Sequence, residues 1–166
     1  MSRSWPVRGI DPDAPLLANA QRVLATRMAE LYAYAPIVSS PEAADEHHDM
    51  RIAAKRLRYA LELFRGLLGA RGERQITRIK KLQEALGQLH DHDIRLEMID
   101  TELAKTTLSS DVCAGLTSLR ARQAAERANW HHAVVTTWTE LNAAGLRLHL
   151  AALSSTSARR PKGVGR

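Results

Sequence analysis

The chain of 166 residues carries 24 lysines and arginines against 18 aspartates and glutamates, which gives a formal net charge of +6. Hydrophobic residues make up 45% and charged residues 25%, a globular balance that excludes wholesale disorder, and the single cysteine, Cys113, excludes a disulfide framework. No signal-peptide pattern and no apolar run of about 18 residues is found, so the sequence predicts one soluble, cytoplasmic domain with a basic surface.

The first part of the chain predicts two helices after an irregular start at residues 1–13. The first helix is expected over 14–34, and Pro36 ends it because the residue before a proline avoids helical geometry. The second is expected over 40–68, where a Ser-Pro-Glu sequence opens it. The apolar stripe of the first helix is expected to comprise Leu17, Leu24, Met28 and Leu31.

The rest of the chain also has helical periodicity. A third helix is expected over 73–105, with a break near Gly87. A helix over 109–132 follows, and a last one extends to a disordered basic tail at 154–166. Because no stretch alternates with a period of two, the predicted fold is all-α, an antiparallel bundle of four to five helices over 14–153.

Positive charge is concentrated between residues 51 and 81, where ten basic residues meet only two acidic ones, Glu62 and Glu73. On a helical wheel, one face of the second helix is basic and lies opposite its apolar stripe. Basic side chains also flank the apolar stripe of the third helix. The two helices are therefore expected to form the walls of a shared anion-binding groove. The aligned residues of the second helix are His48, Arg51, Lys55, Arg58 and Arg65, and those of the third are Arg74, Arg78, Lys80 and Lys81.

The composition of this basic stripe favours a repeating phosphate chain over nucleic acid. Besides basic residues, proteins that bind nucleic acid usually have polar side chains that contact the bases or aromatic side chains on which the bases stack. Here Tyr59 is the only aromatic residue near the stripe. Arginine offers bidentate hydrogen bonds to phosphate and lysine offers a compact charge, so nucleic acid is expected to bind only through generic basicity.

Two segments carry a family resemblance. Residues 48–64 (HDMRIAAKRLRYALELF) and 80–94 (KKLQEALGQLHDHDI) closely resemble the two signature segments of CHAD domains, the conserved histidine α-helical domains. The resemblance implies an α-helical module that binds inorganic polyphosphate on basic helix faces, in proteins often associated with polyphosphate granules. It adds Arg56 to the aligned basic residues, with Gln83 as a further match. The predicted polyphosphate-binding residues are thus His48, Arg51, Lys55, Arg56, Arg58, Arg65, Arg74, Arg78, Lys80 and Lys81.

In one respect the chain departs from the family pattern. CHAD proteins commonly carry two copies of the helical unit, whereas the two signature segments occur once here. Either one unit suffices, or two chains associate as a homodimer. Apolar residues at helical spacing near the C-terminus could bury against a second copy or close the core of one chain. These residues are Trp130, Val134, Trp138, Leu141 and Leu148.

An alternative function arises from paired histidines and acids. His90, Asp93 and Glu97 stand at helical ligand spacings, which permits a metal-dependent phosphohydrolase or a metal-binding bundle. Such a site needs ligands from several helices, and the first helix offers no Glu-x-x-His. No phosphate loop or nucleophile elbow is found, and Cys113 is expected in the core. The sequence therefore predicts binding without catalysis, with no catalytic residue, metal ligand or cofactor.

Overall fold

The computed structural model describes residues 3–105 and 107–145, and these residues form helices and no strands. In chain order the elements are α1 (Leu16–Tyr32), the short 3-10 helix η1 (Ala35–Ile37), α2 (Ala44–Leu63), α3 (Arg65–Leu103) and α4 (Ser110–Ala143). The predicted all-α fold with four to five helices is confirmed. None of the described helices is both long and apolar enough to cross a membrane.

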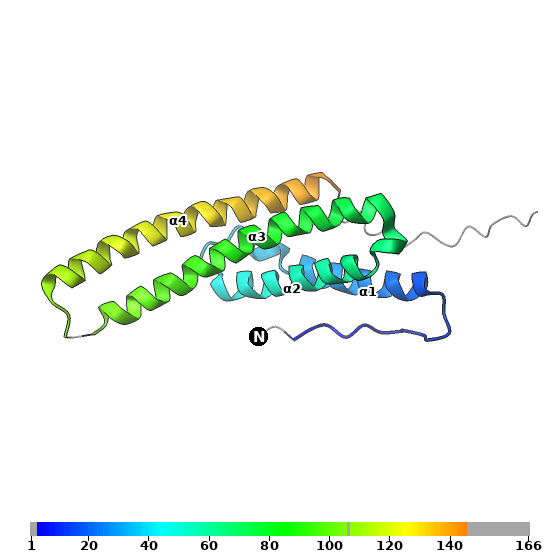
Figure 1. Cartoon of the computed structure of the whole chain (residues 1–166), viewed down its shortest axis with the longest axis horizontal. Helices are drawn as coiled ribbons and strands as arrows, with labels where there is room; N and C mark the ends of the chain where they lie inside the picture. Colours follow the sequence, from blue (N-terminus) through cyan, green and yellow to red (C-terminus); the bar gives the residue numbers. More distant parts are fainter. Residues whose placement is uncertain (1–2, 106, 146–166) are drawn as a thin grey trace, which may run out of the picture.

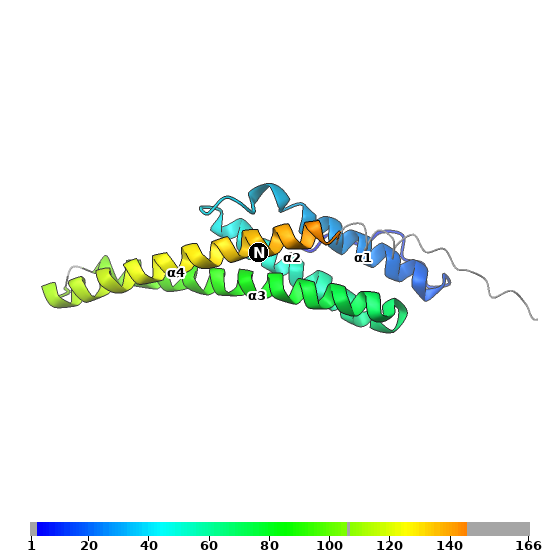
Figure 2. The same ribbon diagram turned by 90° about the horizontal axis from the view of Figure 1, so that it is seen from above.

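The helices lie along one long axis. The two longest, α3 and α4, form a hairpin, and α2 lies between α3 and α1 (Figures 1 and 2). Helices α1 and α2 cover only the half of the hairpin that is farther from its loop, so the other half projects beyond them (Figure 1). Ile94, Met98 and Val112 are exposed large apolar residues on α3 and α4.

The core consists of one apolar stripe from each helix. Of the stripe predicted for α1, Leu24 and Leu31 are buried, Met28 packs against the core and Leu17 is half-buried. Burying a leucine or isoleucine side chain contributes about 1.5–3 kcal/mol, so these stripes dominate the stability of the bundle. The large side chains with the lowest exposure are Leu24, Leu31, Met50, Leu57, Leu61, Ile76, Ile79, Leu82, Leu86 and Leu89.

The turn between α2 and α3 differs from the prediction. Helix α2 ends at Leu63 rather than near residue 68, and α3 begins two residues later. Gly69 lies inside α3, where it has φ 56° and ψ −150° and kinks the helix. A Cβ on Gly72 would lie 2.4 Å from the Cβ of Leu68, so this glycine lets the chain fold back tightly. A side chain at Gly69 would be strained in this conformation.

Two other predicted boundaries were wrong. Helix α3 runs through Gly87 without a break, and α4 is one continuous helix across residue 132. Helix α4 begins where predicted, because Ser109 accepts a hydrogen bond from the backbone N–H of Val112. The chain beyond residue 145, including the predicted tail at 154–166, lies outside the described residues.

The C-terminal apolar residues close the core of one chain. Val134, Trp138 and Leu141 are 0%, 7% and 3% exposed, and the Trp138 ring lies 5.0 Å from the ring of Tyr32 in α1. Of the two alternatives for this face, closure of the core of one chain is the one observed for these three residues. Trp130 is half-buried against the core, and Leu148 lies outside the described residues.

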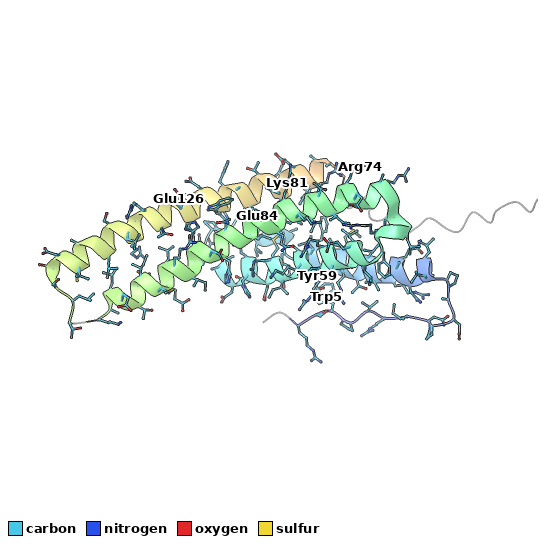
Figure 3. All side chains as sticks on the ribbon, viewed as in Figure 1. Trp5, Tyr59, Arg74, Lys81, Glu84 and Glu126 are labelled. Carbon is cyan, nitrogen blue, oxygen red and sulfur yellow. The ribbon has the colours of Figure 1, made fainter. Side chains whose placement is uncertain are left out.

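The N-terminal segment is irregular over residues 3–13, as predicted, and runs beside α1 (Figures 1 and 3). Asn19 of α1 accepts from the backbone N–H of Asp11 and donates to its carbonyl oxygen at 2.6 Å. The backbone N–H of Trp5 donates to Oε1 of Glu30 at 3.3 Å. Glu30 is 1% exposed and also forms ion pairs with Arg27 at 2.6 Å and with Arg56 at 2.5 Å. One buried carboxylate thus connects the N-terminal segment, α1 and α2.

Candidate anion-binding groove

A groove of about 400 Å³ lies between α2 and α3. Three of the predicted site residues line it, namely Arg51 and Arg58 from α2 and Lys80 from α3. The other lining residues are Gln83, Glu84, Gly87, Gln88 and Asp91. At Gly87 no side chain covers the backbone of α3. If a Cβ atom were added there, its one neighbour within 4 Å would be the Nε atom of Arg51, at 3.9 Å.

The guanidinium of Arg58 is held in place on several sides. Its Nε donates to Oε1 of Gln83 at 2.8 Å, and its Nη1 donates to Glu62 at 3.1 Å. The guanidinium carbon lies 4.3 Å from the centre of the Tyr59 ring, a cation–π distance. Lys80 lies 3.5 Å from the same Glu62 carboxylate. A fixed guanidinium loses less side-chain entropy on binding an anion than a mobile one.

Acidic residues reduce the positive charge of this groove. Glu84 and Asp91 line it together with the three basic side chains, and Glu62 is paired with two of these. The segment 51–81 looks almost purely basic in the sequence because Glu84 and Asp91 lie just beyond it. The groove therefore has a smaller positive charge than the sequence suggests.

His48 lies at one end of α2, in a hollow that is mainly acidic. Its ring centre is 4.5 Å from that of His90, and Asp45, Asp93 and Glu97 line the same hollow. Burial lowers the pKa of His90, and the neighbouring His48 and Arg51 lower it further, whereas Asp91 and Asp93 oppose the shift. His90 is therefore protonated less readily than an exposed histidine.

Three other predicted site residues do not line the groove. Arg56 is held by the ion pair with Glu30 on the α1 side. Arg65 pairs with Glu73 at 2.6 Å on the surface. Lys55 is half-buried on α2, one turn from Arg51, and is not among the lining residues.

The remaining predicted residues lie on the other side of α3, toward α4. Lys81 and Arg78 line a hollow with Thr137 and Glu140 of α4, and Arg74 lines a neighbouring hollow with Arg78. Figure 3 labels Arg74 and Lys81 on α3, toward the end of the molecule where α4 ends. Helix α3 therefore separates the predicted basic residues into two groups. The sequence predicted that they line a single groove.

The metal-binding alternative receives no support from the arrangement of histidines and acids. Across residues 3–105 and 107–145, no group of three or more His, Cys, Asp or Glu side chains could hold a metal ion. Asp93 forms an ion pair with Arg127 of α4, and Nδ1 of His92 lies 2.8 Å from Oε1 of Gln123. Cys113 is half-buried, and not in the core as predicted.

His47 makes the stability of the fold sensitive to acid. It is 2% exposed, and its ring centre lies 5.3 Å from that of His131 in α4. Burial lowers the pKa of His47, and His131 and Arg127 lower it further, while the Val38 carbonyl and Asp93 partly oppose the shift. The unfolded chain, in which the pKa is near 6.5, therefore binds the proton more readily than the folded chain.

We expect the free energy of unfolding to fall as the pH drops from about 7 through 6.5 toward the lowered pKa. Urea unfolding at pH 7.5, 6.5 and 5.5 measures this slope. His47→Leu should reduce it, because leucine does not titrate, and His132→Gln at an exposed position should leave it unchanged. A slope that His47→Leu does not alter would contradict this prediction.

Comparison with known proteins identifies the family. The family model described as "CHAD domain" matches residues 3–100, which is more than half of the chain and includes α1, α2 and most of α3. Searches of curated proteins and of solved structures gave no match. Both segments on which the resemblance was based lie within the matched range. The chain belongs to the CHAD domain family.

Proposed function

We propose that this protein binds inorganic polyphosphate in the groove between α2 and α3 and does not alter it chemically. CHAD domains are in general binding modules for polyphosphate-related substrates. The observation that carries the proposal is the convergence of Arg51, Arg58 and Lys80 from two helices on one groove, with Arg58 held in place by Gln83. Charged hydrogen bonds from such fixed donors suit the oxygens of a phosphate chain.

The same groove lacks the features of a nucleic-acid reader. Of the residues that line it, none is aromatic, so bases would find no stacking platform inside it. Tyr59 lies under the Arg58 guanidinium and is 55% exposed. A bare phosphate chain is narrower than a nucleic acid strand, and it can approach the backbone at Gly87.

Location and association belong to the proposal as well. The proposed location is the cytoplasm, in association with polyphosphate granules. A homodimer remains a prediction, but Val134, Trp138 and Leu141 cannot form its interface without opening the core. Light scattering without ligand, compared with the chain mass of 18.4 kDa, measures the oligomeric state.

A binding titration tests the proposed function. Long-chain polyphosphate, triphosphate, DNA and RNA are compared at equal phosphate concentration and at several salt concentrations. Every affinity should fall with salt, because counterions are released on binding. We expect long-chain polyphosphate to bind at least about tenfold more tightly than DNA at each salt concentration, a difference of about 1.4 kcal/mol.

Two results would contradict the proposal. Equal affinities for polyphosphate and DNA would leave only generic basicity. Release of phosphate from the chain during the titration would show an enzyme, and loss of that activity on chelation would favour the metal-dependent phosphohydrolase instead.

A further inference from the structure

A second hollow lined by arginines lies at the start of α3, away from the α2–α3 groove. Arg71, Arg74 and Arg78 line it together with Gln75, and its volume is about 410 Å³. We call these four residues the arginine cup. Three guanidiniums line the cup and no carboxylate does, whereas two acids line the α2–α3 groove. The cup is therefore the more positive of the two hollows.

The guanidiniums of the cup, those of Arg71, Arg74 and Arg78, form no ion pair within the part of the chain that the structure describes. The nearby Glu73 pairs with Arg65 instead. Three like charges that share one hollow repel each other, and a bound anion would relieve this repulsion.

A buried polar residue, Gln75, holds one arginine of the cup in place. Gln75 is 1% exposed, and its Oε1 accepts a hydrogen bond from Nη1 of Arg78 at 3.3 Å. This bond fixes one guanidinium at the base of the cup. The kink at Gly69 lies just before the cup, so the regular part of α3 starts there with the positive end of its dipole.

The cup is connected to the groove by a series of hollows that share basic side chains. Arg78 lines both the cup and a hollow against α4, and Lys81 lines that hollow and the next one. Lys80 lines this third hollow and also the α2–α3 groove. These adjoining hollows, which Glu140 and Glu84 also line, thus lead from the groove over α3 to the cup.

From this arrangement we infer that the arginine cup binds the terminal phosphoryl group of a polyphosphate chain. A terminal group carries about two negative charges near neutral pH, since its second pKa is about 6, whereas each internal phosphate carries one. The three guanidiniums of the cup, which form no ion pair with a described carboxylate, match this extra charge. The α2–α3 groove, which both basic and acidic residues line, suits the singly charged internal phosphates. The inference rests on the proposed function and assigns Arg71 and Gln75 to it for the first time.

Linear triphosphate and cyclic trimetaphosphate distinguish chain ends from internal phosphates, because the cyclic compound has no terminal group. In calorimetric titrations at pH 8 we expect linear triphosphate to bind about tenfold more tightly than trimetaphosphate. The double variant Arg71→Gln/Arg74→Gln should abolish this preference. Both arginines are exposed, so the fold should persist, and circular dichroism checks that it does.

The matched control is Arg95→Gln/Arg122→Gln, which removes two exposed arginines outside the cup and the groove. It should retain the preference for linear triphosphate. Equal affinities for the two triphosphates, or a preference that survives in the cup variant, would overturn the inference. Inorganic phosphate that binds as tightly as triphosphate would instead assign the cup to free phosphate and also overturn it.

The long-chain titration separates this inference from the proposed function. If long polyphosphate binds more tightly than DNA and the cup variant has no effect on chain ends, the function stands and the cup assignment fails. If polyphosphate and DNA bind equally while the cup variant loses the preference for linear triphosphate, the proposed function fails and the cup remains a phosphoryl site.

Discussion

Replacing Arg51, Arg58 and Lys80 together by glutamine is expected to weaken the binding of long-chain polyphosphate by about 100-fold. A hydrogen bond to a charged group contributes about 1.5–3 kcal/mol when buried and less when exposed, so about 1 kcal/mol for each of the three is a reasonable value. The three side chains lie in the groove rather than in the core, so helix content should not change. Calorimetry or fluorescence anisotropy at fixed salt measures the loss.

The control variant must remove the same charge elsewhere. Arg3, Arg8 and Arg122 are exposed residues outside the groove and the cup, and their replacement by glutamine also lowers the net charge by three. This variant should lose less than about fivefold, through long-range attraction alone. Similar losses in both variants would show that net charge rather than the groove determines affinity.

Replacing Glu30 by glutamine should cause the largest loss of stability among single charge changes. The amide cannot balance the charges of Arg27 and Arg56, which are 14% and 24% exposed beside a carboxylate that is 1% exposed. Breaking a buried ion pair by removing one partner costs about 3–5 kcal/mol, and the lower figure applies here because both arginines reach solvent. Urea unfolding followed by circular dichroism measures the change.

Glu102→Gln is the matched control for this change, because Glu102 pairs with Lys105 on the surface and the pair is about half exposed. Its loss should stay below about 1 kcal/mol. A similar small loss for Glu30→Gln would mean that the contacts among α1, α2 and the N-terminal segment do not depend on this carboxylate. Polyphosphate affinity of the folded Glu30→Gln protein should be unchanged, since Glu30 does not line the groove.

The sequence predicted the helices well because each carries a continuous apolar stripe, and it predicted their ends less well. The break near Gly87 was wrong because a single glycine costs a long packed helix only about 1 kcal/mol, and flanking residues such as Leu86 and Leu89 are buried. The boundary at residue 68 was wrong because helical structure resumes directly after the kink at Gly69, and Leu68 and Gly72, four residues apart, pack closely across it.

For the candidate site, periodicity was more informative than the family resemblance at one position. The wheel placed Arg51 and Arg58 on one face of α2, and both line the groove. Arg56 entered only through the resemblance, and it pairs with Glu30. No local sequence pattern indicates that Glu30 is buried. Likewise, none indicates that α3 separates Arg78 and Lys81 from the groove. Both features depend on where α1 and α4 pack.

Gly87 is an unfavourable residue for helix α3 at a point where this helix lines the groove. Alanine at this position would favour the helix by about 0.5–1 kcal/mol, and the surrounding space would accept its methyl group, since the nearest atom would be 3.9 Å away. The chain therefore forgoes helix stability in the middle of α3. In return, no side chain covers the backbone of α3 at this point of the groove. Helix propensity and an uncovered backbone thus oppose each other at a single residue.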